Sequence, residues 1–416
     1  MGLKNNYKTT ICASCFGYVT QAIMLNFPPL LFIFFQEKLG LTLFQISFLI
    51  SANFITELIV DVLVSKYSSK IGQRFLIILG EALAILGLCC MFILPDVLPS
   101  SFVALMISMM LCGAGGGIME VLISPVVEAC PTKNKAGTMS ILHSFYCWGQ
   151  VAVVLFSTIF FLVFGVDNWM IAAMFWTLVP IVGIFMFSRV TIYDLVEEGQ
   201  ESKPTEILKS GIFWVLVVMM VCAGASELVM SQWASAFCES ALGVEKWVGD
   251  LLGPCMFAVF MGTTRVIYGK FADKLDLTLG IFISAIICIV AYLITIISPI
   301  PALSLVGCGL CGIGAGILWP ASFSIASNKM PRGGVFLFGM LALAGDGGCL
   351  AGPFLSGQIS SAFGDNLKAG FVVALIFPIV LCVISLVMFL KSKAKKECQV
   401  TSSNTDKAIS DINTTK

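Results

Sequence analysis

Long apolar segments alternate with short polar ones along the whole chain. Each apolar segment has about 20 residues or more, the length that an α-helix needs to cross ~30 Å of hydrocarbon. The pattern therefore predicts an all-α membrane protein with twelve transmembrane helices. We place the spans at residues 11–35, 43–65, 75–94, 102–128, 139–164, 169–188, 211–236, 247–268, 278–298, 302–327, 335–362 and 368–390.

The polar segments divide these spans into two groups of six. The longest internal loop is rich in Glu and Lys and separates the sixth span from the seventh. After span twelve the chain becomes Lys-rich and then polar, a composition that cannot bury enough apolar area to fold. We expect an N-terminal half at 1–188, a cytoplasmic linker at 189–210, a C-terminal half at 211–390 and a disordered cytoplasmic tail at 391–416.

Charge sets the expected orientation. If the N-terminus is cytoplasmic, 20 of the 24 Lys and Arg residues fall on cytoplasmic segments, as the positive-inside rule requires. Three lie outside (Lys38, Lys246 and Lys368), and Arg265 lies within a span. We expect a multi-pass plasma-membrane protein with both termini in the cytoplasm. The compact loops and the lack of a eukaryotic targeting signal suggest a bacterial source, and tail lysines are expected to touch anionic lipid.

Composition excludes several classes of protein. Lys+Arg 24 equals Asp+Glu 24, so no electrostatic argument favours nucleic-acid binding. The 16 cysteines lie mostly inside apolar segments, and the chain has one histidine, so we predict no metal and no cofactor. The loops are too short for a soluble catalytic domain, which argues against an enzyme.

The two groups of spans repeat each other. Residues 20–27 of span one match 226–233 of span seven, polar against polar and aromatic against aromatic. Residues 111–118 of span four match 310–317 of span ten, both rich in glycine. Repeats with an even number of spans enter the membrane from the same side, so the expected symmetry axis runs along the membrane normal.

Two cytoplasmic loops carry a motif that resembles a known one. Residues 65–74 and 269–274 resemble the G-x-x-x-D-[RK]-x-G-[RK]-[RK] loop of the major facilitator superfamily, with Ser65 and Ser69 replacing Gly and Asp in the first copy. Residues 117–125 resemble the G-x-L-E-x-x-x-N-P segment of its fucose:proton symporter group, with Ser124 replacing Asn. The resemblance implies proton-coupled uptake of a neutral sugar or related solute by alternating access, and a monomer is expected.

Ionisable residues inside spans are the candidates for proton coupling, because such groups are costly in hydrocarbon and normally face a cavity or a partner. Glu120 follows a glycine run in span four, and we expect it to be the main coupling site. His143 is either a relay to Glu120 or a buried histidine bonded to a backbone carbonyl. Glu227 of span seven is the third candidate. The acid that the symporter group carries in span one has no counterpart here, because that span offers only Gln21 and Asn26.

The expected substrate site is made of amides, aromatic rings and one further acid. Aromatic rings can stack on a sugar ring while amides and acids meet its hydroxyl groups. No Lys and one Arg lie at span depth, so an anionic substrate would find no obvious counter-charge. The predicted substrate-binding residues are Gln21, Asn26, Tyr146, Trp148, Gln150, Trp233, Trp319 and Asp346.

A third set of residues is expected to act as a gate. Asn53, Glu57 and Asp61 are spaced by four and form one polar stripe on span two. Asp61 and Arg265 occupy corresponding depths of spans two and eight, near the cytoplasmic ends where gates close. The predicted gating residues are Asp61, Lys70, Arg74, Arg265, Asp273 and Lys274.

Two other functions stay open at this point. A proton-driven exporter of drugs or metabolites is disfavoured because span five lacks the Gly-Pro pair usual in such exporters. A membrane sensor that binds solute without transport is disfavoured because the loops and tail are short. Na⁺ instead of the proton as coupling ion also stays open, since carboxylates serve either cation.

Overall fold

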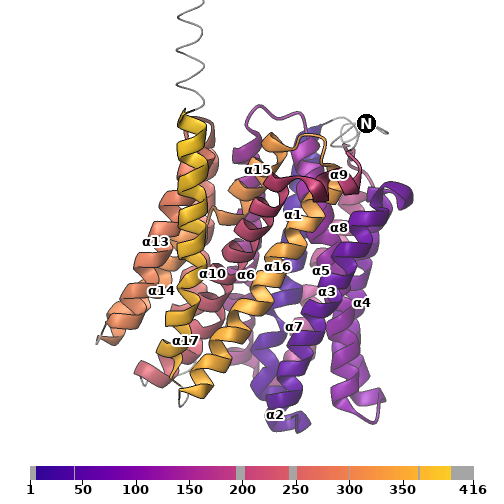
Figure 1. Cartoon of the computed structure of the whole chain (residues 1–416). Coiled ribbons are helices and arrows are strands. Elements are labelled where there is room, and N and C mark those ends of the chain that lie inside the picture. Colours follow the sequence, from indigo (N-terminus) through magenta and orange to yellow (C-terminus); the bar gives the residue numbers. More distant parts are fainter. Residues whose placement is uncertain are drawn as a thin grey trace, which may run out of the picture.

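The computed structural model describes residues 6–41, 43–193, 202–242, 251–298, 300–363 and 366–394. These residues form a bundle of long helices, and no β-strand occurs among them (Figure 1). The all-α prediction is confirmed. We refer to helices before residue 193 as the N-terminal helices and to those after residue 202 as the C-terminal helices.

The N-terminal helices are α1 (Tyr7–Asn26), η1 (Pro28–Leu31), α2 (Phe32–Leu39), α3 (Leu43–Ile71), α4 (Gln73–Val97), α5 (Ser101–Ala129), α6 (Lys135–Phe164), η2 (Val166–Asn168), α7 (Trp169–Trp176) and α8 (Leu178–Phe187). The C-terminal helices are α9 (Pro204–Lys209), α10 (Gly211–Leu242), η3 (Leu251–Cys255), α12 (Met256–Phe271), η4 (Ala272–Lys274), α13 (Leu277–Ile297), α14 (Pro301–Ala315), α15 (Leu318–Lys329), α16 (Gly334–Ala362), α17 (Leu367–Ala374) and a last helical stretch at 376–394.

Ten helical segments of the described chain are long and apolar enough to cross a membrane, and they coincide with ten of the twelve predicted spans. The other two predicted spans are interrupted helices. Span one breaks at Phe27, where the following prolines of η1 lack the N–H groups that would continue α1. The described part of span eight starts with the π-helical turn η3, which contains Pro254, and continues as the 16-residue helix α12.

Proline also explains the breaks inside spans six, ten and twelve. Proline cannot donate to the carbonyl four residues before it. Pro180, Pro320 and Pro378 stand four residues after Trp176, Gly316 and Ala374, which lie at or beside the ends of α7, α14 and α17. Each of these carbonyls, that of Gly316 among them, can accept a hydrogen bond from another donor.

The helices of each group pack mainly on one another, and a smaller set of contacts joins the groups. Within the N-terminal helices, α5 packs on α3, α4 and α1, while α1 also packs on α6. Among the C-terminal helices, α10 packs on α16, and α14 packs on α13 and α12. The groups meet where α6 packs on α12 and α15, and where α16 packs on α3 and α5.

Both ends of the described chain lie at the same end of the bundle, at the top of Figure 1. We call this end the terminal face. The last helix continues through Ala394, four residues into the range predicted as a tail, and residues 395–416 lie outside the described residues. The predicted linker includes the short helix α9 with Ile207 buried, while its residues 194–201 also lie outside the described part.

The two groups of helices are bonded together near the terminal face. Ser327 of α15 donates to Glu128 at the end of α5 over 2.9 Å, and the Asn134 side chain donates to the carbonyl of Gly269 over 3.2 Å. Ser202 N–H donates to the carbonyl of Arg332, which ties the linker to the C-terminal helices. The first two bonds join the ends of helices from both groups, so the structure is closed at the terminal face.

The contact between Gly137 and Gly269 gives a test of this closure. A Cβ on Gly137 would collide with the carbonyl oxygen of Gly269, which is backbone and cannot swing aside. We expect Gly137→Ala to lower the free energy of unfolding by about 1–3 kcal/mol or to separate α6 from α12. Unfolding in mixed micelles and accessibility labelling would measure the two effects. Gly211→Ala is the matched control, because a Cβ there meets nothing within 4 Å. Equal unfolding free energies and equal labelling of the two variants would contradict the close contact between Gly137 and Gly269.

Candidate functional site

Glu120 lies on α5 with its carboxylate bonded to the first helix. The amide nitrogen of Gln21 on α1 donates to Glu120 Oε2 over 2.5 Å. Gln21 is buried, whereas Glu120 keeps part of its surface accessible. The predicted proton-coupling acid and a predicted substrate amide are therefore direct neighbours, and the acid combines a hydrogen-bond partner with access from outside the helix packing.

His143 takes part in a three-membered hydrogen-bonded group. Its Nε2 lies 3.3 Å from both Tyr18 Oη and Ser124 Oγ, and the two hydroxyl groups lie 2.9 Å apart. The tyrosine ring also contacts the imidazole, with 4.9 Å between ring centroids. On the other side, Phe323 of α15 lies 5.7 Å from the imidazole ring. His143 is thus fixed by side chains from α1, α5 and α15, and its polar partners are hydroxyl groups.

Arg265 is buried in the middle of α12 and donates in three directions. Its Nε donates to the carbonyl of Gly316 over 2.7 Å, so it supplies the donor that Pro320 lacks. Nη1 donates to the carbonyl of His143 over 2.8 Å and contacts the sulfur of Cys147. A guanidinium group has five donors in a fixed planar fork, which suits such a mixed set of acceptors.

The third direction of Arg265 is an ion pair. Nη2 lies 3.5 Å from Glu227 Oε2 on α10, and the two side chains are only 3% and 12% exposed. The predicted gating residue Arg265 and the predicted coupling residue Glu227 are therefore partners of each other. Since Arg265 also bonds to α6, the pair links the C-terminal helices to the N-terminal ones near the middle of the bundle.

The polar stripe of α3 faces the glycine run of α5. Positions for a Cβ on Gly116 and Gly117 lie 2.9 Å from Glu57 Oε1 and from Asp61 Oδ1, respectively. Only glycine leaves room for these acids. Asp61 interacts with the carboxyl group of Asp346 on α16, which is itself buried. The predicted gating acid and the predicted substrate acid therefore belong to one buried cluster between α3 and α16.

The predicted aromatic residues do not gather in one place. Trp233 donates its indole N–H to the carbonyl of Pro353 over 3.2 Å, and Trp319 packs against Gly345 with 7% of its surface exposed. Trp148 packs against Gly262 and is 38% exposed. Among the predicted rings, Tyr146 is partly exposed and interacts with Asn26.

Two predicted amides differ in their environment. Asn26 donates to the carbonyl of Ala22 on its own helix and keeps part of its surface accessible, whereas Gln150 is buried. Of the substrate-site predictions, Gln21, Asp346, Asn26 and Tyr146 are thus the ones that lie near Glu120 or beside one another.

The basic residues predicted to gate are spread over the terminal face. Arg74 donates to the carbonyls of Phe187 and Val190, where it caps the end of α8 within the N-terminal helices. Lys70 is exposed at the end of α3. The side chain of Asp273 lies outside the described residues. The structure does not bring this predicted set together.

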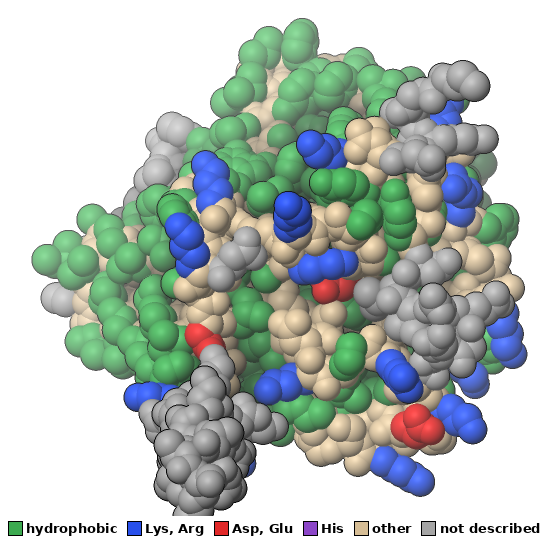
Figure 2. Space-filling model, turned by 90° about the horizontal axis from the view of Figure 1, so that it is seen from above, with side chains coloured by type: hydrophobic (Ala, Val, Ile, Leu, Met, Phe, Trp, Pro, Cys, Tyr) green, Lys and Arg blue, Asp and Glu red, His purple; other side chains and the backbone are tan. Residues whose placement is uncertain are grey.

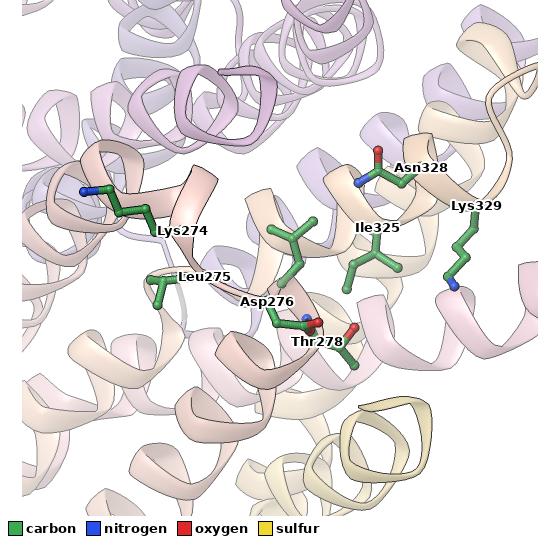
Figure 3. A pocket seen from close by; sticks show the side chains of 8 residues that line it. Lys274, Leu275, Asp276, Thr278, Ile325, Asn328 and Lys329 are labelled. Carbon is green, nitrogen blue, oxygen red and sulfur yellow. The ribbon is translucent and has the colours of Figure 1, made fainter. Parts of the chain in front are cut away.

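Lys274 lines a pocket of about 560 Å³ at the start of α13 (Figure 3). Lys329 lies at the opposite end of this pocket, with Asp276 and Thr278 between the two lysines. The pocket contains none of the predicted coupling or substrate-binding residues. It is an indentation of the terminal face rather than part of the buried site.

Two residues of the site were not singled out as functional by sequence reasoning. Tyr18 stands three positions before Gln21, and Ser124 stands four after Glu120. These spacings place each residue on the same helix face as a predicted one. Extending every intramembrane acid or amide by three and four positions would have found both.

The arrangement combines a partly accessible acid, a hydroxyl–imidazole group and a largely buried ion pair on facing helices. Glu120 and Glu227 each keep a small part of their surface accessible. No group of three or more His, Cys, Asp or Glu side chains in the described part of the chain has the geometry to hold a metal ion. The chemistry available is proton binding and hydrogen bonding to a solute.

Comparison with known proteins gives consistent matches. A family model described as Major Facilitator Superfamily matches residues 9–336 and 256–412. The membrane protein MosC of Rhizobium meliloti is 25% identical over 320 residues, which cover 75% of this chain and 74% of that protein.

Two solved structures share the fold. A crystal structure of an alanine variant of the E. coli fucose:proton symporter FucP superimposes with a TM-score of 0.72, and one of the transporter FucP in the outward conformation superimposes with a TM-score of 0.75. Each solved chain is 15% identical to this one, and each match covers 91% of this chain and 98% of the solved chain. At this identity the match concerns the fold.

Proposed function

This chain belongs to the major facilitator superfamily of membrane transporters, and we propose that it couples the uptake of a neutral sugar or related small solute to proton entry by alternating access. The two groups of helices rock about a site near the middle of the bundle, as expected for repeats related by an axis along the membrane normal. The solved transporter of similar fold that is described as a fucose:proton symporter supports this proposal.

The observation that carries the proposal is the environment of Glu120. Its carboxylate accepts from a neutral amide, Gln21, and keeps part of its surface accessible. Arg265, the one buried cation among the described residues, is engaged with Glu227. A carboxylate without a cationic partner in a membrane interior is costly, so a proton is its natural counter-charge.

The same environment favours an uncharged solute. The polar groups that interact with Glu120 are an amide, tyrosine hydroxyl groups and acids, while the guanidinium group of Arg265 already has acceptors in three directions. Amides and acids match sugar hydroxyl groups, which both donate and accept hydrogen bonds. An anionic solute would meet acids instead of a free cation.

The terminal face is proposed to be cytoplasmic. Figure 2 shows Lys and Arg side chains spread over this face, with few acidic ones between them. Basic residues concentrate on the cytoplasmic side of membrane proteins. Because the structure is closed at this face, it corresponds under this proposal to a state that does not release solute into the cytoplasm.

A proteoliposome experiment tests the proposal. The protein is reconstituted with an internal pH dye, and hexoses, pentoses and disaccharides are added under an inward proton gradient. We expect acidification of the lumen with one class of neutral sugar and none in protein-free liposomes. Solute entry driven only by a Na⁺ gradient would assign Na⁺ as the coupling ion. Proton-driven efflux without uptake would replace the proposal by export.

A further inference from the structure

A second proton site, distinct from Glu120, is indicated by the acids between α3 and α16. Asp61 and Asp346 come from the two groups of helices and are 0% and 5% exposed. In the described chain, neither oxygen of Asp61 has a partner with hydrogen-bond geometry, and Asp346 Oδ2 also lacks one. The two carboxyl groups nevertheless interact with each other.

Charge around this pair makes two ionised carboxylates untenable. The titratable side chains that interact with the pair come from α1, α3, α5 and α16, and in the described chain none is a cation: Tyr18, Glu57, Glu120 and Cys349. Two like charges that interact in a buried site cannot both stay ionised, so one proton is shared. Glu57 adds to this repulsion because it is buried and its charge acts on both Asp61 and Asp346.

The position of the pair ties this proton to closure. Directly beside it, towards the terminal face, Ser65 of α3 packs against Gly339 of α16, with no room for a Cβ on the glycine. The α3–α16 contact therefore holds the two acids together only while the terminal face is closed. Opening this face separates α3 from α16 and admits water to each carboxyl group.

We propose that Asp61 and Asp346 share one proton in the closed structure and release it into the water at the terminal face when that face opens. The closed state then binds one proton more than the open state. The ratio of closed to open molecules therefore falls as the pH rises, by about tenfold per pH unit for one proton. This inference rests on alternating access in the proposed function, but it concerns a different acid from Glu120.

The test measures closure directly, without solute. Spin labels on non-canonical amino acids at Ser69 and Arg332, both exposed at the terminal face and on different groups of helices, report the distance across it in nanodiscs. We expect the short distance to dominate at low pH and to give way to a longer one as the pH rises. In the double variant Asp61→Asn/Asp346→Asn, which leaves neither acid of the pair, the ratio of the short to the long distance should change by less than about twofold per pH unit.

Two variants serve as controls. Glu81→Gln removes a buried acid that lies on α4, away from the contact between the groups, and Glu57→Gln removes the neighbouring acid on α3. Both should keep the pH dependence. The inference is overturned if wild type shows no pH dependence, if the double variant Asp61→Asn/Asp346→Asn keeps it, or if Glu57→Gln alone abolishes it. Since no solute is present, failure of sugar-driven proton entry in liposomes would leave this result unaffected.

Discussion

Glu120→Gln is expected to abolish solute accumulation while leaving solute exchange intact. Glutamine can still accept from Gln21, so the hydrogen bond between α1 and α5 can form, but the side chain no longer binds and releases a proton. With one proton per solute, a pH gradient of one unit sustains about tenfold accumulation. The variant should reach a ratio of about one, whatever the gradient.

Radiolabelled uptake into proteoliposomes measures accumulation, and counterflow without a gradient measures exchange. Glu81→Gln is the matched control, because it is the same chemical change at an acid of the N-terminal helices that is fully buried, whereas Glu120 keeps part of its surface accessible. Accumulation by Glu120→Gln equal to that of wild type would remove Glu120 from the coupling mechanism. Loss of both activities in a folded variant would assign it to solute binding instead.

Arg265→Gln is expected to cause the largest loss of stability of the variants considered. It leaves Glu227 without its cationic partner and removes the donor to Gly316. Removing one partner of a buried ion pair costs about 3–5 kcal/mol, because the remaining charge stays buried without compensation. Unfolding by SDS in mixed micelles, followed by circular dichroism, measures the change.

The double variant Arg265→Gln/Glu227→Gln separates the ion pair from the other bonds of Arg265. We expect it to recover part of the lost stability, since no unpaired charge remains. Lys38→Gln is the control: its partner Asp167 lies 3.3 Å away and both side chains are largely exposed, so the change should stay within about 1 kcal/mol. If Arg265→Gln and Lys38→Gln lowered the free energy of unfolding by the same amount, the structural role of the buried pair would be contradicted.

Much of the fold follows from local properties of the sequence. Hydropathy locates ten spans that the structure reproduces, because the cost of placing polar residues in hydrocarbon acts on each segment separately. Prolines account for breaks such as the one at Gly316, since the missing N–H is a property of the residue itself. The spacing of Glu57 and Asp61 also predicts correctly that both lie on one face of α3.

The pairing of charges was decided by the tertiary structure. Asp61 and Arg265 lie at corresponding depths of spans two and eight, which relates the two residues in the sequence. In the structure Arg265 pairs with Glu227 instead, and Asp61 interacts with Asp346. Sequence fixes the depth of a residue and its face on a helix. Which faces meet depends on the rotation and approach of whole helices, and here these are set by close contacts at glycines such as Gly117 and Gly339. Such contacts involve residues far apart in the chain, so only the packed bundle determines them.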